Sequence, residues 1–537
     1  MIADVVYVNG DFLTLAGAEP RTDALAVSAG RVVALGADAA ALPAGRVVDL
    51  RGAPVVPGFH DAHSHTLAFG LSLSELRLTS PPLTSLAELY AVVGERAAQQ
   101  APGTWVIAGG YDQNKIGGAH PTRFELDRVA GDHPVWLTHT SGHMCVVNSR
   151  VLAAIDLSSR PKLAALVERD AAGETTGLLL EQAQSLVSDL LPPLGIGVMA
   201  AAIGEAHVRY LREGLTSCQE AGIGSGLAGF GPQEPAAYRL ARASGVLGVR
   251  TTLMFEVDYL DSAPPDELAV LPSNADDWLR LGPVKLFADG SLLGRTAAMA
   301  EDFCGDPGNR GQLQRSEVEL CSTICRFHAA GWQLATHAIG DRAVEVVLDS
   351  YAQALQLYPR FDHRHRIEHC GVATPEQVRR IVALGVVPVP QGRFVGEIGE
   401  AMAQVLGPER TPWCYRLRSF LDAGVELPGS SDRPVVAGPP LLGIHDMVNR
   451  RTELGNPFVP EEALTPLQAL RAYTLGSAFA AFVEHDRGSL EIGKLADFAV
   501  LSEDVTRCDP NRIRDVRVEA TVVGGVLCYD DAGFDQR

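Results

Sequence analysis

The sequence lacks any uninterrupted apolar run of about 18 residues, the length that a membrane-spanning helix requires. Its N-terminus, MIADVVYVNGDF, also lacks the basic start and long apolar core of a secretory signal. Positive charge is scarce, because 45 Lys and Arg residues stand against 65 Asp and Glu residues and give a net charge of −20. A chain of this charge repels phosphate backbones and anionic lipid surfaces. We therefore expect a cytoplasmic protein with neither a nucleic acid nor a membrane as partner.

Paired cysteine motifs are missing as well. The nine cysteines are scattered without a CxxC arrangement, which argues against a disulfide framework and against a thiolate zinc site. The closest pair, Cys321 and Cys325, lies one helical turn apart. We interpret it as two half-buried thiols on a helix rather than as a redox pair.

What the chain does contain is enough apolar sequence for a large core. Hydrophobic residues make up 46% and charged residues 20% of 537 residues, which is typical of a soluble enzyme and excludes disorder. The length exceeds what one hydrophobic core usually serves. We therefore expect several domains, or one large barrel with additions.

Both ends of the chain contain short runs rich in β-branched residues, separated by glycine-containing turns such as Asn9-Gly10. This pattern predicts short β-strands. Neither end has enough strands for a stable sheet alone. The simplest arrangement is one composite β-sandwich domain, formed by residues 1–57 together with residues 485–537.

Between the ends, short apolar runs alternate with helical segments, which predicts an α/β fold with a parallel sheet. Eight strands, the number in a (β/α)8 TIM barrel, are expected within one barrel domain at 58–484. The stretch from about 70 to 205 is too long for one connection, so we expect a partly helical subdomain inserted after the first barrel strand. The strands are expected at 54–65, 215–222, 249–257, 283–290, 332–341, 365–370, 386–391 and 425–432.

Polar side chains recur at the C-terminal ends of these strands. In a barrel, that end carries the active site. Five strands contribute: His63 and His65 end the first, Lys285 and Asp289 the fourth, His337 the fifth, His369 the sixth and Asp432 the eighth.

The segment FHDAHSH, residues 59–65, suggests a metal site. Residues i and i+2 of a strand point to the same side, so His63 and His65 can reach one ion, whereas His60 and Asp61 need not. Nitrogen and carboxylate ligands without thiolate favour zinc, with Mn2+, Fe2+ or Co2+ as substitutes.

An ammonium group cannot bind a cation, so Lys285 has two interpretations. It pairs with a carboxylate such as Asp289, or it is carboxylated to a carbamate that bridges two metals.

The motifs together resemble the metal-dependent amidohydrolase superfamily, and specifically its YtcJ-like branch, which includes N-substituted formamide deformylases. The resemblance covers nearly the whole chain. It rests on PGFHDAHSH, GGYDQNKIGG, SGHMCVVNSRVL, GLTSCQEAG, VKLFADGSLLGRTA, THAIGDRAV, RIEHC, GSSDRPV and GSLEIGKLADFAVL.

The resemblance implies a two-metal site, with a single metal as the alternative if Lys285 is not carboxylated. His63 and His65 would hold one zinc, His337 and His369 the second, and Lys285 would be the bridging carbamate. Asp432 would contact metal and move protons. Two residues depart from the expected pattern, namely Arg433 beside Asp432 and Glu220 in CQEAG.

The predicted reaction is hydrolysis of an amide-type C–N bond by metal-activated water, with an N-substituted formamide or N-acyl amine giving a carboxylate and an amine. Asp432 would take a proton from water and deliver it to the leaving amine. Esters, lactones, cyclic amides or deamination on the same site are alternatives. A non-catalytic ligand-binding barrel is a third reading, and a homodimer is a reasonable expectation.

Further polar residues are candidates for contact with the small-molecule substrate. The inserted region supplies Asp112, Gln113, His143 and Asn148, for which the alternative is a role in turns and caps. The barrel supplies Asp289 and Arg393; Arg393 either meets a substrate carboxylate or forms a structural salt bridge.

Overall fold

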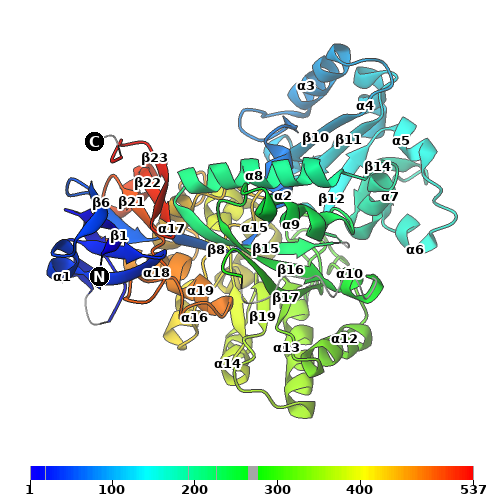
Figure 1. Cartoon of the computed structure of the whole chain (residues 1–537). Helices are drawn as coiled ribbons and strands as arrows, with labels where there is room; N and C mark the ends of the chain where they lie inside the picture. The colour runs from blue at the N-terminus through cyan, green and yellow to red at the C-terminus, as the bar shows by residue number, and fades with distance from the viewer. Residues whose placement is uncertain (1, 18–19, 192, 225–226, 264–275, 536–537) are drawn as a thin grey trace.

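The computed structural model describes residues 2–17, 20–191, 193–224, 227–263 and 276–535 (Figure 1). At its centre lies a seven-stranded sheet whose neighbouring strands are all parallel. The sheet curls into a nearly closed barrel, so the predicted α/β barrel fold is confirmed. In spatial order its strands are β20 (Val387–Val389), β19 (Arg366–His369), β18 (Leu334–Ala338), β17 (Leu279–Phe287), β16 (Arg250–Glu256), β15 (Leu215–Ile223) and β8 (Phe59–Ser64).

The expected eighth strand, 425–432, is wrong as a regular strand, because it has no strand conformation. It still runs beside β8: the Ala62 amide donates to the Gly429 carbonyl at 3.0 Å, and the Asp432 amide donates to the His63 carbonyl at 2.7 Å. Pro428 has no amide hydrogen to offer a ladder, and Asp432 has a left-handed φ of 58°. These two residues explain why the chain is extended but irregular here.

Helices between the strands cover the outside of the barrel with apolar faces. In α13 the buried residues Val344, Val347, Leu348 and Tyr351 recur at helical spacing and belong to the main core. The barrel helices include α8 (Ile196–Arg212), α9 (Glu234–Ala243), α10 (Val257–Ser262), α12 (Glu317–Ala329), α13 (Asp341–Leu357), α14 (Pro375–Leu384), α15 (Arg393–Arg410) and α17 (Pro440–Asn449).

The two ends of the chain lie together at one side of the barrel (Figure 1). A four-stranded sheet contains β5 (Arg31–Leu35), β4 (Leu25–Ser28), β1 (Ala3–Val8) and β6 (Ala44–Asp49). A six-stranded sheet joins N-terminal β7 (Pro54–Pro57), β2 (Asp11–Leu13) and β3 (Arg21–Thr22) to C-terminal β21 (Phe498–Leu501), β22 (Val518–Val523) and β23 (Val526–Asp530). Residues of both sheets, among them Val27 and Phe498, share one apolar core. The exact domain boundaries stay a prediction.

The long segment after β8 forms a sheet of its own, which stands apart from the terminal sheets (Figure 1). Its core includes Leu89 from α3 (Leu86–Gln99) and Leu126 from α4 (Arg123–Ala130). The strands, in spatial order, are β13 (Val167–Arg169), β14 (Thr175–Leu180), β12 (Met144–Val147), β11 (Val135–His139), β10 (Val106–Tyr111) and β9 (Leu76–Arg77). We call this part the inserted sheet.

Cys321 and Cys325 are half-buried free thiols on α12, as the sequence predicted. Within the described ranges, no helix is long and apolar enough to cross a membrane.

Candidate metal centre

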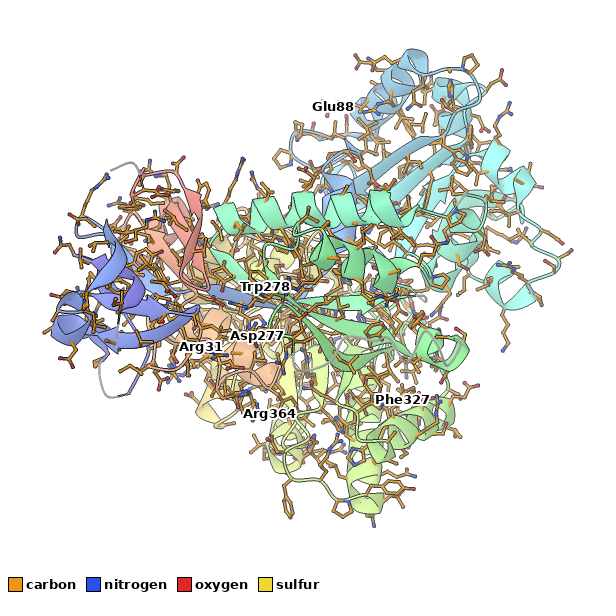
Figure 2. All side chains as sticks on the ribbon, viewed as in Figure 1. Arg31, Glu88, Asp277, Trp278, Phe327 and Arg364 are labelled. Atoms are coloured by element: carbon orange, nitrogen blue, oxygen red, sulfur yellow. The ribbon has the colours of Figure 1, made fainter. Side chains whose placement is uncertain are left out.

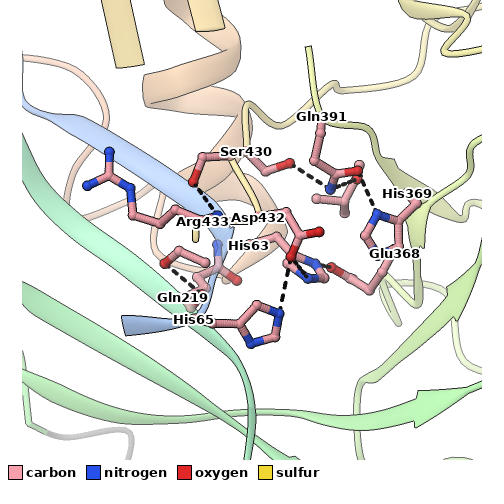
Figure 3. Close-up of polar contacts among 12 residues, drawn as sticks. His63, His65, Gln219, Glu368, His369, Gln391, Ser430, Asp432 and Arg433 are labelled. Atoms are coloured by element: carbon pink, nitrogen blue, oxygen red, sulfur yellow. Dashed lines mark hydrogen bonds and ion pairs between the residues drawn. The ribbon is translucent and has the colours of Figure 1, made fainter. Parts of the chain in front are cut away.

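The ring of His63 lies between two carboxylates at the mouth of the barrel (Figure 3). On one side its Nδ1 atom is hydrogen-bonded to Glu368 from β19. On the other side its Nε2 atom lies 3.3 Å from Oδ1 of Asp432. All three side chains are buried. Glu368 therefore fixes the ring so that Nε2 faces the centre of the site.

The Asp432 carboxylate contacts both His63 and His65, at and just after the end of β8. Nε2 of His65 lies 3.1 Å from the same Oδ1 atom that approaches His63. Burial by itself raises the pKa of Asp432, but the close contacts of His63 and His65 and the charge of His369 outweigh it and hold the pKa well below the ordinary value. Asp432 is therefore ionised near neutral pH.

His369 completes a compact donor set. Its Nδ1 atom is 2.7 Å from Oε1 of Gln391, which leaves Nε2 to face the site. His63, His369 and Asp432 each offer one ligand atom, and these atoms lie within 4.8 Å of one another. Nε2 of His63 is buried and makes no hydrogen bond to a described residue. Two imidazoles, one of them with an unsatisfied buried nitrogen, and one carboxylate fit a divalent transition metal.

His337 lies beside this set but is oriented differently. Its ring centre is 4.4 Å from that of His369. Its Nε2 atom is 3.0 Å from the Gly290 carbonyl oxygen and 3.5 Å from Oδ1 of Asp289. The structure thus brings His337 to the site without turning Nε2 toward Asp432.

Lys285 is buried on β17, with its ammonium 4.7 Å from the Phe287 ring centre. Burial lowers its pKa, while the charges of Glu368 and Asp432 raise it. Among the described residues it forms no ion pair within 4.0 Å. The lysine therefore lies close to the candidate metal site with its amine unpaired.

Asp289, the expected partner of that lysine, supports backbone instead. Its carboxylate accepts hydrogen bonds from the amides of Ala298, Ile339 and Gly340 at 2.8 to 3.0 Å. Burial raises its pKa to about 7. This carboxylate holds two barrel-top loops together.

His143 reaches the site from the inserted sheet. Its Nδ1 atom is 2.7 Å from Oε2 of Glu181, which is fully buried. Its ring centre is 5.2 Å from that of His337, and it lines the same small cavity as Asp432. The Glu181 side chain also accepts a hydrogen bond from the Gln314 side-chain amide at 2.7 Å. Gln314 thus fixes the carboxylate that orients the His143 ring.

Asp112 and Asn148 act as caps. Asp112 accepts from the Asn114 amide at 2.9 Å, where the 3-10 turn η1 (Gln113–Lys115) begins. Asn148 caps α5 (Ser149–Ala154), where its side chain accepts from the Val151 amide at 3.4 Å and donates to the His133 carbonyl at 2.9 Å. Asp112 also lines the larger cavity described below.

Gln113 and Arg393 both make polar contacts within the protein: Gln113 a hydrogen bond and Arg393 two ion pairs. Oε1 of Gln113 is 2.6 Å from Nε2 of His139. Arg393 forms ion pairs with Asp446 at 2.5 Å and Glu397 at 3.0 Å. Its charge is thereby compensated within the protein.

The two residues that depart from the expected family pattern differ in position. Oε1 of Glu220 lies 4.0 Å from Nδ1 of His65, at the edge of the site. The Arg433 side chain turns away: it pairs with Glu213 at 2.6 Å and its guanidinium lies 4.8 Å from the Phe69 ring centre.

Three supporting residues were missed by reasoning from the sequence: Glu368, Gln391 and Glu181. Glu368 did leave a signal, since RIEHC places Arg366 and Glu368 on one side of an otherwise apolar strand. Such charges are buried only when they are paired. In the structure they form a fully buried ion pair at 2.7 Å.

Two adjoining cavities open at the site. The smaller, of about 30 Å³, has room for water beside His143, His337, His369 and Asp432. The larger, of about 800 Å³, lies between the inserted sheet and the barrel-top segments. Ile398 and Val435 line both cavities, so the two cavities are neighbours. The size of the larger one is typical of a small-molecule site.

Known proteins resemble the chain over nearly its full length. Residues 46–529 match the profile described as "Amidohydrolase family". The chain is 30% identical to N-substituted formamide deformylase of Arthrobacter pascens, over 99% of each protein. It is 29% identical to the putative amidohydrolase YtcJ of Bacillus subtilis, over 98% of this chain and 99% of that protein. A crystal structure of an uncharacterized metal-dependent hydrolase from Pyrococcus horikoshii aligns with a TM-score of 0.74 and 26% identity, over 94% of this chain and 99% of that one.

Proposed function

The chain belongs to the amidohydrolase family and is a hydrolase, and from this premise we propose that it cleaves the C–N bond of an N-substituted formamide or N-acyl amine. The resemblance and the hydrolase class predicted from the motifs are thereby confirmed. The substrate class is supported by the full-length similarity to a protein named as a formamide deformylase.

The observation that carries the proposal is the position of Asp432. Its Oδ1 atom lies 3.1 Å from His65 and 3.3 Å from His63, at the wall of the small cavity. An ionised carboxylate in that position can accept a proton from water and return it to a leaving group.

A bound divalent metal would supply Lewis acidity, which acidifies water and polarises the carbonyl group. His63, His369 and Asp432 would hold it. Asp432 would take one proton from the attacking water. After the oxygen has bonded to the carbonyl carbon, the same proton would pass to the amide nitrogen as the C–N bond breaks. The direct products are an amine and a carboxylic acid, which then loses its remaining proton to solvent to give the carboxylate.

His143 is proposed to contact the substrate from the opposite side of the small cavity. Its Nδ1 atom is held by Glu181 at 2.7 Å, so the rest of the ring edge is left for the cavity. With a substrate in the small cavity, this carboxylate–imidazole pair would present a ring nitrogen to the reacting carbonyl.

A two-metal arrangement, which the motifs predict, is the alternative to one ion held by His63, His369 and Asp432. In it His63 and His65 would hold one metal, His337 and His369 the second, and Lys285 would be the bridging carbamate. The burial of Lys285 without an ion-pair partner among the described residues supports this role. Metal analysis of Lys285→Ala, with and without bicarbonate, tests it: loss of one metal is expected, and an unchanged stoichiometry of two would reject the bridge.

The proposed activity is tested by measuring amine release from a panel of N-substituted formamides, N-acyl amino acids and esters. Zinc-loaded enzyme is compared with chelated enzyme and with Asp432→Asn. Metal-dependent amine release that falls by about 10²-fold or more in Asp432→Asn is expected. Turnover of esters only, or full activity of Asp432→Asn, would overturn the assignment.

A further inference from the structure

The lining of the larger cavity has a small excess of positive charge, opposite in sign to the net charge of the protein. The chain carries a net charge of −20, yet five cationic and four acidic side chains line this cavity. Lys115 is paired with Glu453 at 2.6 Å, and Arg393 occupies two of the remaining acids, Glu397 and Asp446. Positive charge is thus left over in the cavity that adjoins the one beside Asp432.

Among these cations, Arg77 has no ion-pair partner within the described residues. It is the last residue of β9, the edge strand of the inserted sheet, and is exposed to the cavity. Its nearest acids, Glu75 and Glu397, influence its charge, but neither lies within 4.0 Å in the part of the chain that the structure describes. Burial of part of the side chain lowers its pKa. An anion at this position would offset that cost.

The surroundings of Arg77 leave room for a ligand and supply a second polar group. The guanidinium lies close to Gly110, where a Cβ atom would be 3.4 Å from Nη2, at van der Waals distance. Ser80, three residues along, lines the same cavity, and its buried hydroxyl finds no hydrogen-bond partner among the described residues. A guanidinium without an ion-pair partner among the described residues suits the planar oxygens of a carboxylate, and the Ser80 hydroxyl could turn toward the same ligand.

We propose that Arg77, assisted by Ser80, binds a carboxylate of the substrate, so that the enzyme acts on N-formyl or N-acyl amines that carry a carboxylate, such as N-acyl amino acids. This rests on the proposed function, which it narrows to acidic substrates. Arg393, the residue that the sequence suggested for such a contact, is neutralised by its own ion pairs. The carboxylate of the substrate would lie in the larger cavity, and its amide in the adjoining small cavity beside Asp432.

The test compares N-formylphenylalanine with its uncharged analogue, N-formylphenylalaninamide. Binding is measured by calorimetry, and amine release in parallel, for the wild-type metal-loaded enzyme, Arg77→Gln and Arg77→Lys. Arg96→Gln is the matched control, because Arg96 lies on α3 of the same region, outside the cavity. Melting temperatures show that each variant is folded.

The wild type is expected to bind the carboxylate about 10- to 100-fold more tightly than the carboxamide. Arg77→Gln should abolish this preference and leave carboxamide binding unchanged, Arg77→Lys should keep part of it, and Arg96→Gln should keep all of it. Equal binding of both compounds by the wild type, or an intact preference in Arg77→Gln, would overturn the inference. Amine release from both compounds alike would then leave the proposed function standing. Conversely, a carboxylate preference lost in Arg77→Gln without any turnover would support the Arg77 site and reject the proposed function.

Discussion

Glu368 is hydrogen-bonded to Nδ1 of His63, which decides that Nε2 is the nitrogen turned toward Asp432. The carboxylate is itself paired with Arg366, whose guanidinium also donates to the Ala62 carbonyl at 2.7 Å. A ligand histidine oriented by a carboxylate is a recurring feature of metal sites in proteins.

The first prediction concerns this support. Glu368→Gln should lower zinc affinity about 10- to 100-fold, because the amide orients the imidazole less firmly and leaves Arg366 without its charge partner. Competition with a fluorescent chelator measures the affinity. Glu301→Gln, at an exposed position, is the control and should match the wild type. Unchanged affinity in Glu368→Gln would show that His63 does not depend on Glu368, or does not bind metal.

The second prediction separates substrate contact from metal binding. His143→Ala should lower kcat/KM for the best substrate about 10²-fold while the metal content stays constant, because His143 lies in the small cavity outside the donor set. Glu181→Gln should give a smaller loss of the same kind. His485→Ala, an exposed histidine outside the cavities, should have no effect. Normal kinetics of His143→Ala would reduce this residue to a structural role.

The third prediction concerns the junction between the barrel and the terminal sheets. Arg250 of β16 forms a buried two-pronged ion pair with Asp497, at 2.7 and 3.1 Å, just before β21. Its guanidinium lies 4.7 Å from the Trp278 ring centre, next to Asp277, both of which Figure 2 labels. Asp497→Asn should lower the free energy of unfolding by about 3 to 5 kcal/mol, because a buried cation loses its partner.

Urea unfolding measures this loss. Asp535→Asn is the matched control, since Asp535 is paired with Arg46 at the surface and its loss should cost about 1 kcal/mol or less. Equal effects of the two variants would mean that the buried pair contributes no more than a surface pair.

The fourth prediction is a loss of stability in acid through His363 and His365. Nδ1 of His365 accepts from the Leu334 amide at 3.1 Å and Nδ1 of His363 accepts from the His365 amide at 2.9 Å, so both rings are neutral in the fold. Burial lowers the pKa of both, and the charge of Arg360 lowers them further. The unfolded chain takes up protons near pH 6.5, before the folded chain does. Stability from these groups is therefore complete above about pH 6.5 and lost as the pH falls below it.

Measuring the free energy of unfolding from pH 8 to pH 5 checks this. His365→Asn keeps an acceptor for the Leu334 amide but cannot be protonated, so its stability should fall less steeply with decreasing pH than that of the wild type. Identical slopes would contradict the prediction.

The sequence by itself determined the elements whose rules are local. The i, i+2 spacing of His63 and His65 placed both on one side of an extended segment. Polar residues at the ends of apolar strands indicated the mouth of a barrel, and the combined motifs indicated the family. It even located the eighth barrel position at 425–432, although Pro428 and the left-handed Asp432 make that segment irregular. Such signals are readable because they depend on neighbours a few residues apart.

Only the tertiary structure decided which partners these residues meet. Glu368 reaches His63 across 305 positions of the chain, and Glu181 fixes a histidine 38 positions away. Likewise, Arg393 is neutralised within the protein while Arg77 faces the cavity without an ion-pair partner among the described residues. These outcomes follow from barrel register and from the way the inserted sheet docks on the barrel mouth. Barrel register and the docking of the inserted sheet produce no periodic pattern in the sequence. Both are set by contacts between segments that are distant along the chain.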